Sequence, residues 1–447
     1  MSYHDHPLLS QAAVLLYQAL THFWPEVATL EEAETLLLRL SQEVARQAAT
    51  RFAEAQVAAV EQEAPTCRCG ARMQAEQRRV RAVLLLFGLL RCRCRRYRCP
   101  QCGTWRCPGA ERLGLAPRQR LTGTLQELIT HFGLSWSYQV AAVLLGRVLP
   151  GAAVSAKTVE RVTKRSAAIR QAREDQDAQR CLAGSPPVDG AGPVPPAFPP
   201  FAQPTRVYLG LDGILVRGRA RKSWLEVQVA SWWSAWRELP DRRHPRREIT
   251  DRTLHARALG WEALGEQVWR VFVARGGVRE PAPEVVILGD GARGIRSLWE
   301  LHFPECRALL DPWHLWEKVK ERAREVLGDR ARGLGAAEGV YRQLRRGAVA
   351  AACELVAHWP ASTPWAQERR DRLLAFLTRN QDVIADYDAL REAGYLTGSG
   401  LTEKANDLVV APRMKNGKMH WSRAGASAVA LLRAHVLNDP AGHILPT

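Results

Sequence analysis

The stretch Glu284-Val-Val-Ile-Leu-Gly-Asp290-Gly291-Ala292 decides the fold that this sequence predicts. Its apolar run is rich in β-branched residues and too short for a helix, so it predicts a buried central strand. Asp290 follows at the carboxyl end of that strand, where open α/β sheets bind their ligands. A second run, Arg206-Val-Tyr-Leu-Gly-Leu-Asp212-Gly213, delivers another carboxylate in the same way. The two acids indicate a divalent-metal site, although Asp-Gly after a strand is also typical of a tight hairpin turn.

The order of elements around these runs predicts an α/β fold. Strands are expected at 207–216, 224–230 and, more weakly, 249–254, followed by helix 261–274, strand 285–289, helix 295–301, strand 306–310 and helix 313–326. Three antiparallel strands followed by alternating helices and strands is the order of a ribonuclease H-like core. In that core the first and fourth strands are neighbours at the centre of the sheet, which would bring Asp212 beside Asp290. This adjacency favours a metal site over two unrelated turns.

The composition of the chain indicates a polyanionic partner. The 447 residues suffice for about three domains, and 46% hydrophobic with 24% charged residues is ordinary for a globular protein. The net charge of +17 is unusual, and most of the positive charge is arginine, whose planar fork suits phosphate oxygens. Nucleic acid is therefore expected ahead of an acidic membrane surface. Arginines on solvated faces are the alternative that charge alone leaves open.

No targeting or membrane segment is expected. Residues 1–10 lack the basic start and apolar stretch of a signal peptide, and the longest apolar run, at 83–90, is too short to span a bilayer. A cytoplasmic, nucleoid-associated protein is the prediction. Seven of the ten cysteines crowd between Cys67 and Cys107, and in a reducing compartment such crowding favours metal binding over disulfides.

Changes in composition divide the chain into segments. A Pro/Gly-rich stretch that cannot pack as helix or sheet predicts a linker. A Gly-rich turn at 398–400 marks the last predicted boundary. The segments are a helical arm at 1–62, a cysteine-rich module at 63–112, a helical region at 113–181, the linker at 182–204, the first part of the α/β core at 205–320, an all-helical insertion at 321–397, and a final core helix with the C-terminal tail at 398–447. The arm fits either a pairing surface or an ordinary amphipathic core helix.

The cysteine-rich module predicts a structural zinc site. Cys99-Pro-Gln-Cys102-Gly has the spacing of a zinc knuckle, in which the Gly lets backbone amides approach sulfur. Tetrahedral zinc needs four ligands, so Cys67, Cys69, Cys99 and Cys102 are the first choice. The pairing stays open, because Cys67 and Cys69 have one residue too few between them and Cys92, Cys94 and Cys107 compete.

Two basic segments are candidates for DNA contact. Arg91, Arg93 and Arg95 would lie on one side of a strand, where they could bind a phosphate backbone or form a solvated sheet face. Further on, several helices with short breaks end in a helix that starts at a Ser cap and carries Lys157 and Arg161. Helix, turn and basic helix is the order of a helix-turn-helix DNA reader, and plain three-helix packing is its alternative.

Taken in order, these residues resemble a known family. The motifs are Asp212-Gly, Gly289-Asp290-Gly-Ala, Asp311-Pro-Trp-His314, Gly398-Ser-Gly-Leu-Thr-Glu403, Arg413-Met-Lys and Met419-His-Trp421-Ser422, with Glu111-Arg-Leu-Gly-Leu115 and Val154-Ser-Ala-Lys-Thr-Val-Glu-Arg161 upstream. The set resembles the DDE transposases of bacterial insertion sequences, the Kra-type family first and the Lre-type family second. The resemblance covers the chain from about Cys67 to Ala434. The Cys-x-Cys of the first knuckle departs from the Cys-x-x-Cys usual in such families.

The resemblance implies a catalytic triad of Asp212, Asp290 and Glu403. Three carboxylates suit two hard cations, Mg²⁺ or else Mn²⁺, which activate the attacking oxygen and stabilise the leaving oxygen at a phosphodiester. Asp311 and His314 match an auxiliary Asp-x-x-His element, which orients DNA or a triad carboxylate unless it is a helix-start Asp with a packed His.

The resemblance also implies the partners. Arg413, Lys415 and Lys418 would contact a DNA backbone, while Trp421 would pack in the core. The expected partner is double-stranded DNA, both element ends and target, bound by a homo-oligomer. A structure-specific nuclease on the same fold and a catalytically inactive, domesticated DNA-binding protein are the competing hypotheses.

Overall fold

The computed structural model shows a mixed α/β protein whose chain divides into two units. Unit 1 comprises Met1–Gly133 and Tyr138–Val159, and unit 2 comprises Leu134–Ser137 and Glu160–Thr447. No helix in the described part of the chain is long and apolar enough to cross a membrane. The structure describes residues 14, 17–18, 21–22, 27–183, 200–202, 205–239, 246–328, 330–398, 400–415, 419–440 and 442–444.

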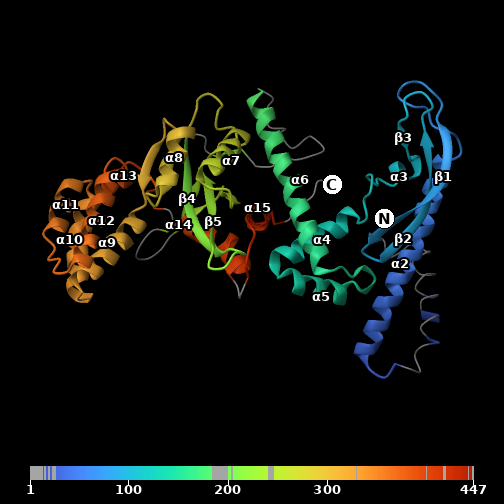
Figure 1. The fold of residues 1–447 in the computed structure, drawn as a ribbon, viewed down its shortest axis with the longest axis horizontal. Coiled ribbons are helices and arrows are strands. Elements are labelled where there is room, and N and C mark those ends of the chain that lie inside the picture. The colour runs from blue at the N-terminus through green and yellow to red at the C-terminus, as the bar shows by residue number, and fades with distance from the viewer. Residues whose placement is uncertain are drawn as a thin grey trace. The chain divides into compact units, whose positions relative to one another are not determined.

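Unit 1 is built on a long helix and a β-hairpin (Figure 1). A capping box at Thr29 starts helix α2 (Leu30–Val60), because the Thr29 side chain accepts from Glu32 and Glu32 bonds back to the cap. Alternate residues of the hairpin are buried against this helix, including Cys92 and Cys94. The strands and the short helix that follows are β1 (Gln74–Leu85), β2 (Gly88–Arg98), β3 (Trp105–Arg106) and α3 (Pro108–Arg112).

Three helices follow where the sequence predicts them. They are α4 (Gly123–Ser135), α5 (Tyr138–Val148) and α6 (Ala156–Leu182), with a 3₁₀ turn at Pro150–Ala152. The predicted cap is confirmed, since the Ser155 hydroxyl accepts from the Thr158 backbone N–H at 3.2 Å. The boundary between the two units falls within α6 in the chain, between Val159 and Glu160. The predicted linker lies largely outside the described residues.

A five-stranded mixed sheet forms the centre of unit 2. Its strand order is β10-β9-β4-β5-β8, in which β5 is antiparallel to β4 and β8 while β9 is parallel to β4 and β10. The strands are β4 (Arg206–Arg217), β5 (Trp224–Trp233), β8 (Thr253–Arg257), β9 (Glu284–Gly289) and β10 (Arg307–Leu310). The weak strand predicted at 249–254 is wrong in position, because an additional hairpin of β6 (Trp236–Leu239) and β7 (Arg246–Ile249) precedes β8.

The alternation of side chains gives the sheet two different faces. On β4, Val207, Leu209 and Leu211 pack against α7 (Trp261–Ala274) and α8 (Arg293–His302), which cover one face. Residues of the other parity, from Tyr208 through Val216, face the opposite side, where α14 (Gly400–Val409) and α15 (Arg423–Asn438) pack. Asp212 has this parity, so it lies on the side of the sheet that α14 covers.

Helices replace strands after β10. They are α9 (Pro312–Leu327), α10 (Arg330–Arg345), α11 (Val349–Ala357), α12 (Pro364–Arg379) and α13 (Tyr387–Glu392) (Figure 1). These helices share a separate apolar core with Leu310. The helix that begins near Glu403 is shorter than predicted. It ends at Val409 and gives way to a π-helical turn, Ala411–Lys415, because Pro412 cannot continue the α-helical hydrogen bonds.

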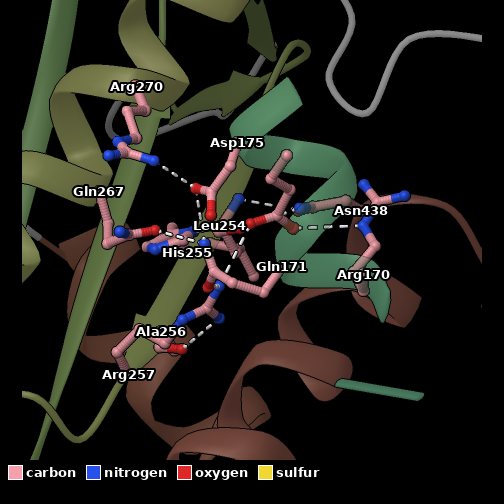
Figure 2. Close-up of polar contacts among 11 residues, drawn as sticks. Arg170, Gln171, Asp175, Leu254, His255, Ala256, Arg257, Gln267, Arg270 and Asn438 are labelled. Atoms are coloured by element: carbon pink, nitrogen blue, oxygen red, sulfur yellow. Dashed lines mark hydrogen bonds and ion pairs between the residues drawn. The ribbon is translucent and has the colours of Figure 1, made fainter. Parts of the chain in front are cut away.

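A buried polar network anchors α6 to the sheet (Figure 2). Glu174 accepts from Arg170 at 3.2 Å and from Arg257 of β8 at 3.2 Å, and it lies 3.9 Å from the His255 ring. Burial lowers the pKa of Arg257 to about 10 and the pKa of His255 well below its ordinary value. Next to Glu174, Asp175 of α6 pairs with the Arg270 guanidinium of α7 at 2.8 Å. These contacts explain why most of α6 belongs to unit 2.

Candidate functional site

The register of the sheet places Asp212 level with Asp290. β4 and β9 pair in parallel up to Gly210 and Leu288, and each aspartate lies two residues further on. Both have the parity of Gly210, so alternation directs both towards the α14 side of the sheet. Because neighbouring strands lie ~4.8 Å apart, the two aspartates are near neighbours on the central strand pair.

Neither Asp-Gly pair forms a hairpin turn. Asp212 does not end its strand as predicted, because β4 continues to Arg217 and Asp212 pairs there with Val229 of β5. Asp290 does follow its strand, at the junction with α8, and its Oδ1 accepts from the Ala292 backbone N–H at 2.8 Å.

Helix α14 carries Glu403 to the same side. It packs directly on the backbone of β4, since a Cβ on Gly210 would overlap the Thr402 hydroxyl. One turn beyond Glu403, the Asn406 Nδ2 donates to Asp212 Oδ2 at 2.6 Å. Glu403 and Asn406 therefore share the face of α14 that meets the central strand. Neither Asn406 nor Thr402 was predicted; their spacing of three and one residues from Glu403 is the only sequence signal for them.

The Asp-x-x-His element reaches the same cluster from the start of α9. Asp311 is fully buried and caps the helix, accepting from the His314 backbone N–H at 3.3 Å and contacting His314 Nδ1 at 2.8 Å. The other ring nitrogen of His314 lies 3.9 Å from Glu403 Oε1. Asp311 is thus the helix-start residue of the second alternative, and the His314 that it contacts lies beside Glu403.

The electrostatics of the cluster are those of crowded, partly buried acids. Burial raises the pKa of Asp212 to about 6, and repulsion from Asp290 and Glu403 acts in the same direction. Burial likewise raises the pKa of Glu403. The hydrogen bond with Asp311 raises the pKa of His314 to about 9, so a cationic imidazole faces these acids at neutral pH.

The cluster fits a hard cation. The ligand atoms of Asp311, His314 and Glu403 all lie within 4.8 Å of one another, so these three residues could hold a metal ion. Glu403 Oε1, Asn406 Oδ1 and the Thr402 hydroxyl are buried and have no hydrogen-bond partner among the described residues. Oxygen atoms of this kind are the ligands that Mg²⁺ and Mn²⁺ prefer. Among the described residues, this set joins Asp311 and His314 to the predicted Glu403, and it contains neither Asp212 nor Asp290.

A second candidate metal site lies in unit 1, where Cys67, Cys69, Cys99 and Cys102 form a cluster that could hold a metal such as zinc. The Sγ atoms of Cys67 and Cys102 are 3.5 Å apart, those of Cys69 and Cys99 are 3.5 Å apart, and those of Cys69 and Cys102 are 3.8 Å apart. Four sulfurs bound at ~2.3 Å to a tetrahedral zinc would be separated by about 3.8 Å. The short first knuckle therefore does not prevent the four thiols from meeting.

The glycines and a hydroxyl of the knuckles support this arrangement. Gly70 and Gly103 both have positive φ, 87° and 73°, which lets each loop fold tightly behind its cysteines. A hydrogen bond with Thr104 lowers the pKa of the Cys102 thiol, which favours the thiolate that binds metal. The competing Cys92 and Cys94 belong to a different cluster, packed against α2.

The side chains predicted to contact DNA from β2 and α6 differ in their exposure to solvent. Arg91 and Arg93 are exposed on the outer side of β2, Arg95 is half-buried, and Lys157 and Arg161 are exposed on α6. These side chains remain available to a phosphate backbone, apart from the partly covered Arg95.

Arg413 is a correction to the sequence-based prediction. It is 2% exposed and its guanidinium stacks 4.8 Å from the centre of the Trp421 ring, so it is part of the core and not a backbone contact. Trp421 is buried, as predicted. Lys415 is exposed, and Lys418 lies outside the described residues.

No protein-family model matches the sequence. No curated protein matches it either.

Proposed function

We propose that this chain is an insertion-sequence transposase that cuts DNA phosphodiester bonds and joins the freed 3′-hydroxyl to target DNA. The observation that carries the proposal is the convergence of acids from three separate segments. Asp212 and Asp290 are level on adjacent parallel strands, and Glu403 lies on the helix α14, which packs on β4 and bonds to Asp212 through Asn406. The pKa of Asp212 responds to both other acids, which supports their proximity.

The order of the sheet supports a ribonuclease H-like core. Three antiparallel strands, β4, β5 and β8, are followed by two parallel strands added on the other side of β4. The two aspartates come from the first and fourth of these strands, as that plan requires. The helices between β10 and α14 interrupt the core before its last acidic residue.

In this proposal Asp212, Asp290 and Glu403 hold two Mg²⁺ ions. When bound, these ions would activate the attacking oxygen and neutralise charge on the leaving oxygen. Asn406 fixes the rotamer of Asp212 through its 2.6 Å hydrogen bond. Asp311 holds His314 next to Glu403, so the imidazolium offsets the repulsion among the acids. The exposed arginines of β2 and the basic start of α6 bind the DNA backbone.

The test uses DNA that carries the inverted repeats flanking the gene, incubated with Mg²⁺ and a target plasmid. The wild-type protein should cut the repeat ends and insert them. So should the control variant Asp407→Asn, which changes an exposed acid on α14. Asp290→Asn should do neither. Equal cutting by wild type and Asp290→Asn would refute the proposed triad. Cutting without insertion would favour a nuclease, and DNA binding without cutting by any of the three would favour an inactive descendant.

A further inference from the structure

A cavity of about 780 Å³ opens beside the candidate active site in unit 2. Asp311 and Glu403 form one part of its wall, so it is continuous with the acidic cluster. The rest of the wall comes mainly from α9, α10 and α13. Its principal side chains are of two kinds, aromatic and cationic: Trp313, Trp316, Tyr341, Arg342, Arg345 and Arg391. Glu338 also lines it.

The aromatic part of the cavity wall consists of two packed rings and one exposed ring. Trp316 and Tyr341 lie 5.2 Å apart between ring centres and are half-buried, so they are held by the helical core. Trp313 is different, because 54% of it is exposed although it is a large aromatic residue next to buried Asp311. An exposed tryptophan face in a cavity is a stacking surface for a planar ligand.

The cationic wall offers one guanidinium for an anion. Arg345 pairs with Asp388, and Arg391 lies 3.6 Å from the same carboxylate. Arg342 is exposed and makes no ion pair with any described residue. A phosphate could therefore bind Arg342 without breaking an existing pair, while Asp388 keeps the other two arginines in place.

We propose that this cavity binds one unpaired nucleotide of the DNA strand that is cut at the acidic cluster. The base stacks on Trp313 and a phosphate pairs with Arg342. The volume is within the ~300–1,000 Å³ of pockets that enclose a small ligand, and it admits a single extruded nucleotide but not a duplex. The inference rests on the proposed function, because it places the pocket next to the site of strand cleavage.

A binding experiment with two DNA probes tests this inference on the full-length protein. One probe is a blunt duplex, and the other is the same duplex with three unpaired nucleotides at one end, one of them 2-aminopurine. Ca²⁺ replaces Mg²⁺ so that binding is measured without cleavage. The wild-type protein should bind the second probe about tenfold more tightly, since each stacked base contributes at the level of tenfold or more. Binding should also quench the 2-aminopurine fluorescence.

Matched variants separate the pocket from other surfaces. Trp313→Ala and Arg342→Ala should each lose most of the preference while binding the blunt duplex as before. Trp365→Ala removes a comparably exposed tryptophan, 49% exposed on α12 and outside the cavity, and should keep the preference. Both substituted residues of the pocket are exposed, so folding is not at risk.

The outcomes distinguish the two levels of the argument. If wild type binds and cuts the repeat DNA but Trp313→Ala and Arg342→Ala keep the full preference, the pocket inference is wrong and the proposed function stands. The same holds if Trp365→Ala loses the preference as strongly as Trp313→Ala. If wild type binds neither probe and cuts no DNA, the proposed function fails and the pocket inference fails with it.

Discussion

Replacing Asp212 by Asn should stabilise the metal-free protein while abolishing DNA cleavage. Burial raises the pKa of Asp212 to about 6 from its ordinary value of 3.8, so the folded protein binds this proton more tightly than the unfolded chain. The free energy of unfolding therefore falls as the pH rises from about 4 to about 6, and it stays lower above that window. An Asn at this position has no charge to desolvate, and it does not titrate, so it adds no pH dependence to the free energy of unfolding.

The structure sets the size of the effect. A rise of this pKa from 3.8 to about 6 corresponds to at most about 3 kcal/mol at neutral pH. The carboxylate accepts from the Gly213 backbone N–H and from Asn406, and an amide can accept only the first. Asn406 can rotate so that its own Oδ1, which has no partner among the described residues, accepts from the new amide. A net gain of about 2–3 kcal/mol is expected at pH 7.5.

The assay is urea unfolding after EDTA treatment, followed by hydrogen exchange of peptides from β4 and β9. The transition of Asp212→Asn should lie above that of wild type at pH 7.5, and the two should converge near pH 4. Glu354→Gln, which changes an exposed acid on α11 away from the cluster, should match wild type at both values. A stability difference that is the same at pH 4 and pH 7.5, or an equal shift in Glu354→Gln, would refute the reasoning.

Three further predictions concern other parts of the chain. Glu174→Gln should lower the free energy of unfolding by about 3–5 kcal/mol, since it removes the carboxylate that pairs with two buried guanidinium groups. Glu266→Gln at an exposed pair should cost under about 1 kcal/mol in the same urea titration. Native mass spectrometry should detect one zinc ion on the wild-type protein and on Cys107→Ser, and none on Cys99→Ser. Arg413→Ala should lower stability by about 2 kcal/mol or more through lost packing and leave duplex affinity unchanged in fluorescence anisotropy.

Local pattern sufficed for the parts of the fold that depend on neighbours in sequence. The run before Asp290 forms β9, and the helix predicted from Trp261 to Ala274 has those bounds in the structure. The strand predicted at 207–216 forms β4, which runs through Asp212 to Arg217. The prediction that Asp212 lies at the carboxyl end of this strand was wrong, because Asp212 pairs with Val229 inside the sheet.

Tertiary contacts account for the remaining differences at the candidate site. A cationic residue in a polar segment predicts a surface position, yet Arg413 is buried because the Trp421 ring covers it. Asn406 enters the cluster only because α14 crosses β4 at a residue without a side chain, Gly210. Sequence spacing could place these residues on a helix or strand, but it could not identify which surface would meet them.

The candidate active site and the core of the sheet depend on the same register. Asp290 lies 78 residues after Asp212, and Leu288 lies 78 residues after its β4 partner Gly210. The two acids are therefore level wherever this pairing holds. A slip of one residue would turn one aspartate to the face where Leu209 and Leu211 pack against α7 and α8. Burying a carboxylate there would cost far more than the cluster costs now. The apolar packing of the sheet thus requires the alignment that brings the acids together, and the convergence of these two carboxylates follows from the stability of the core.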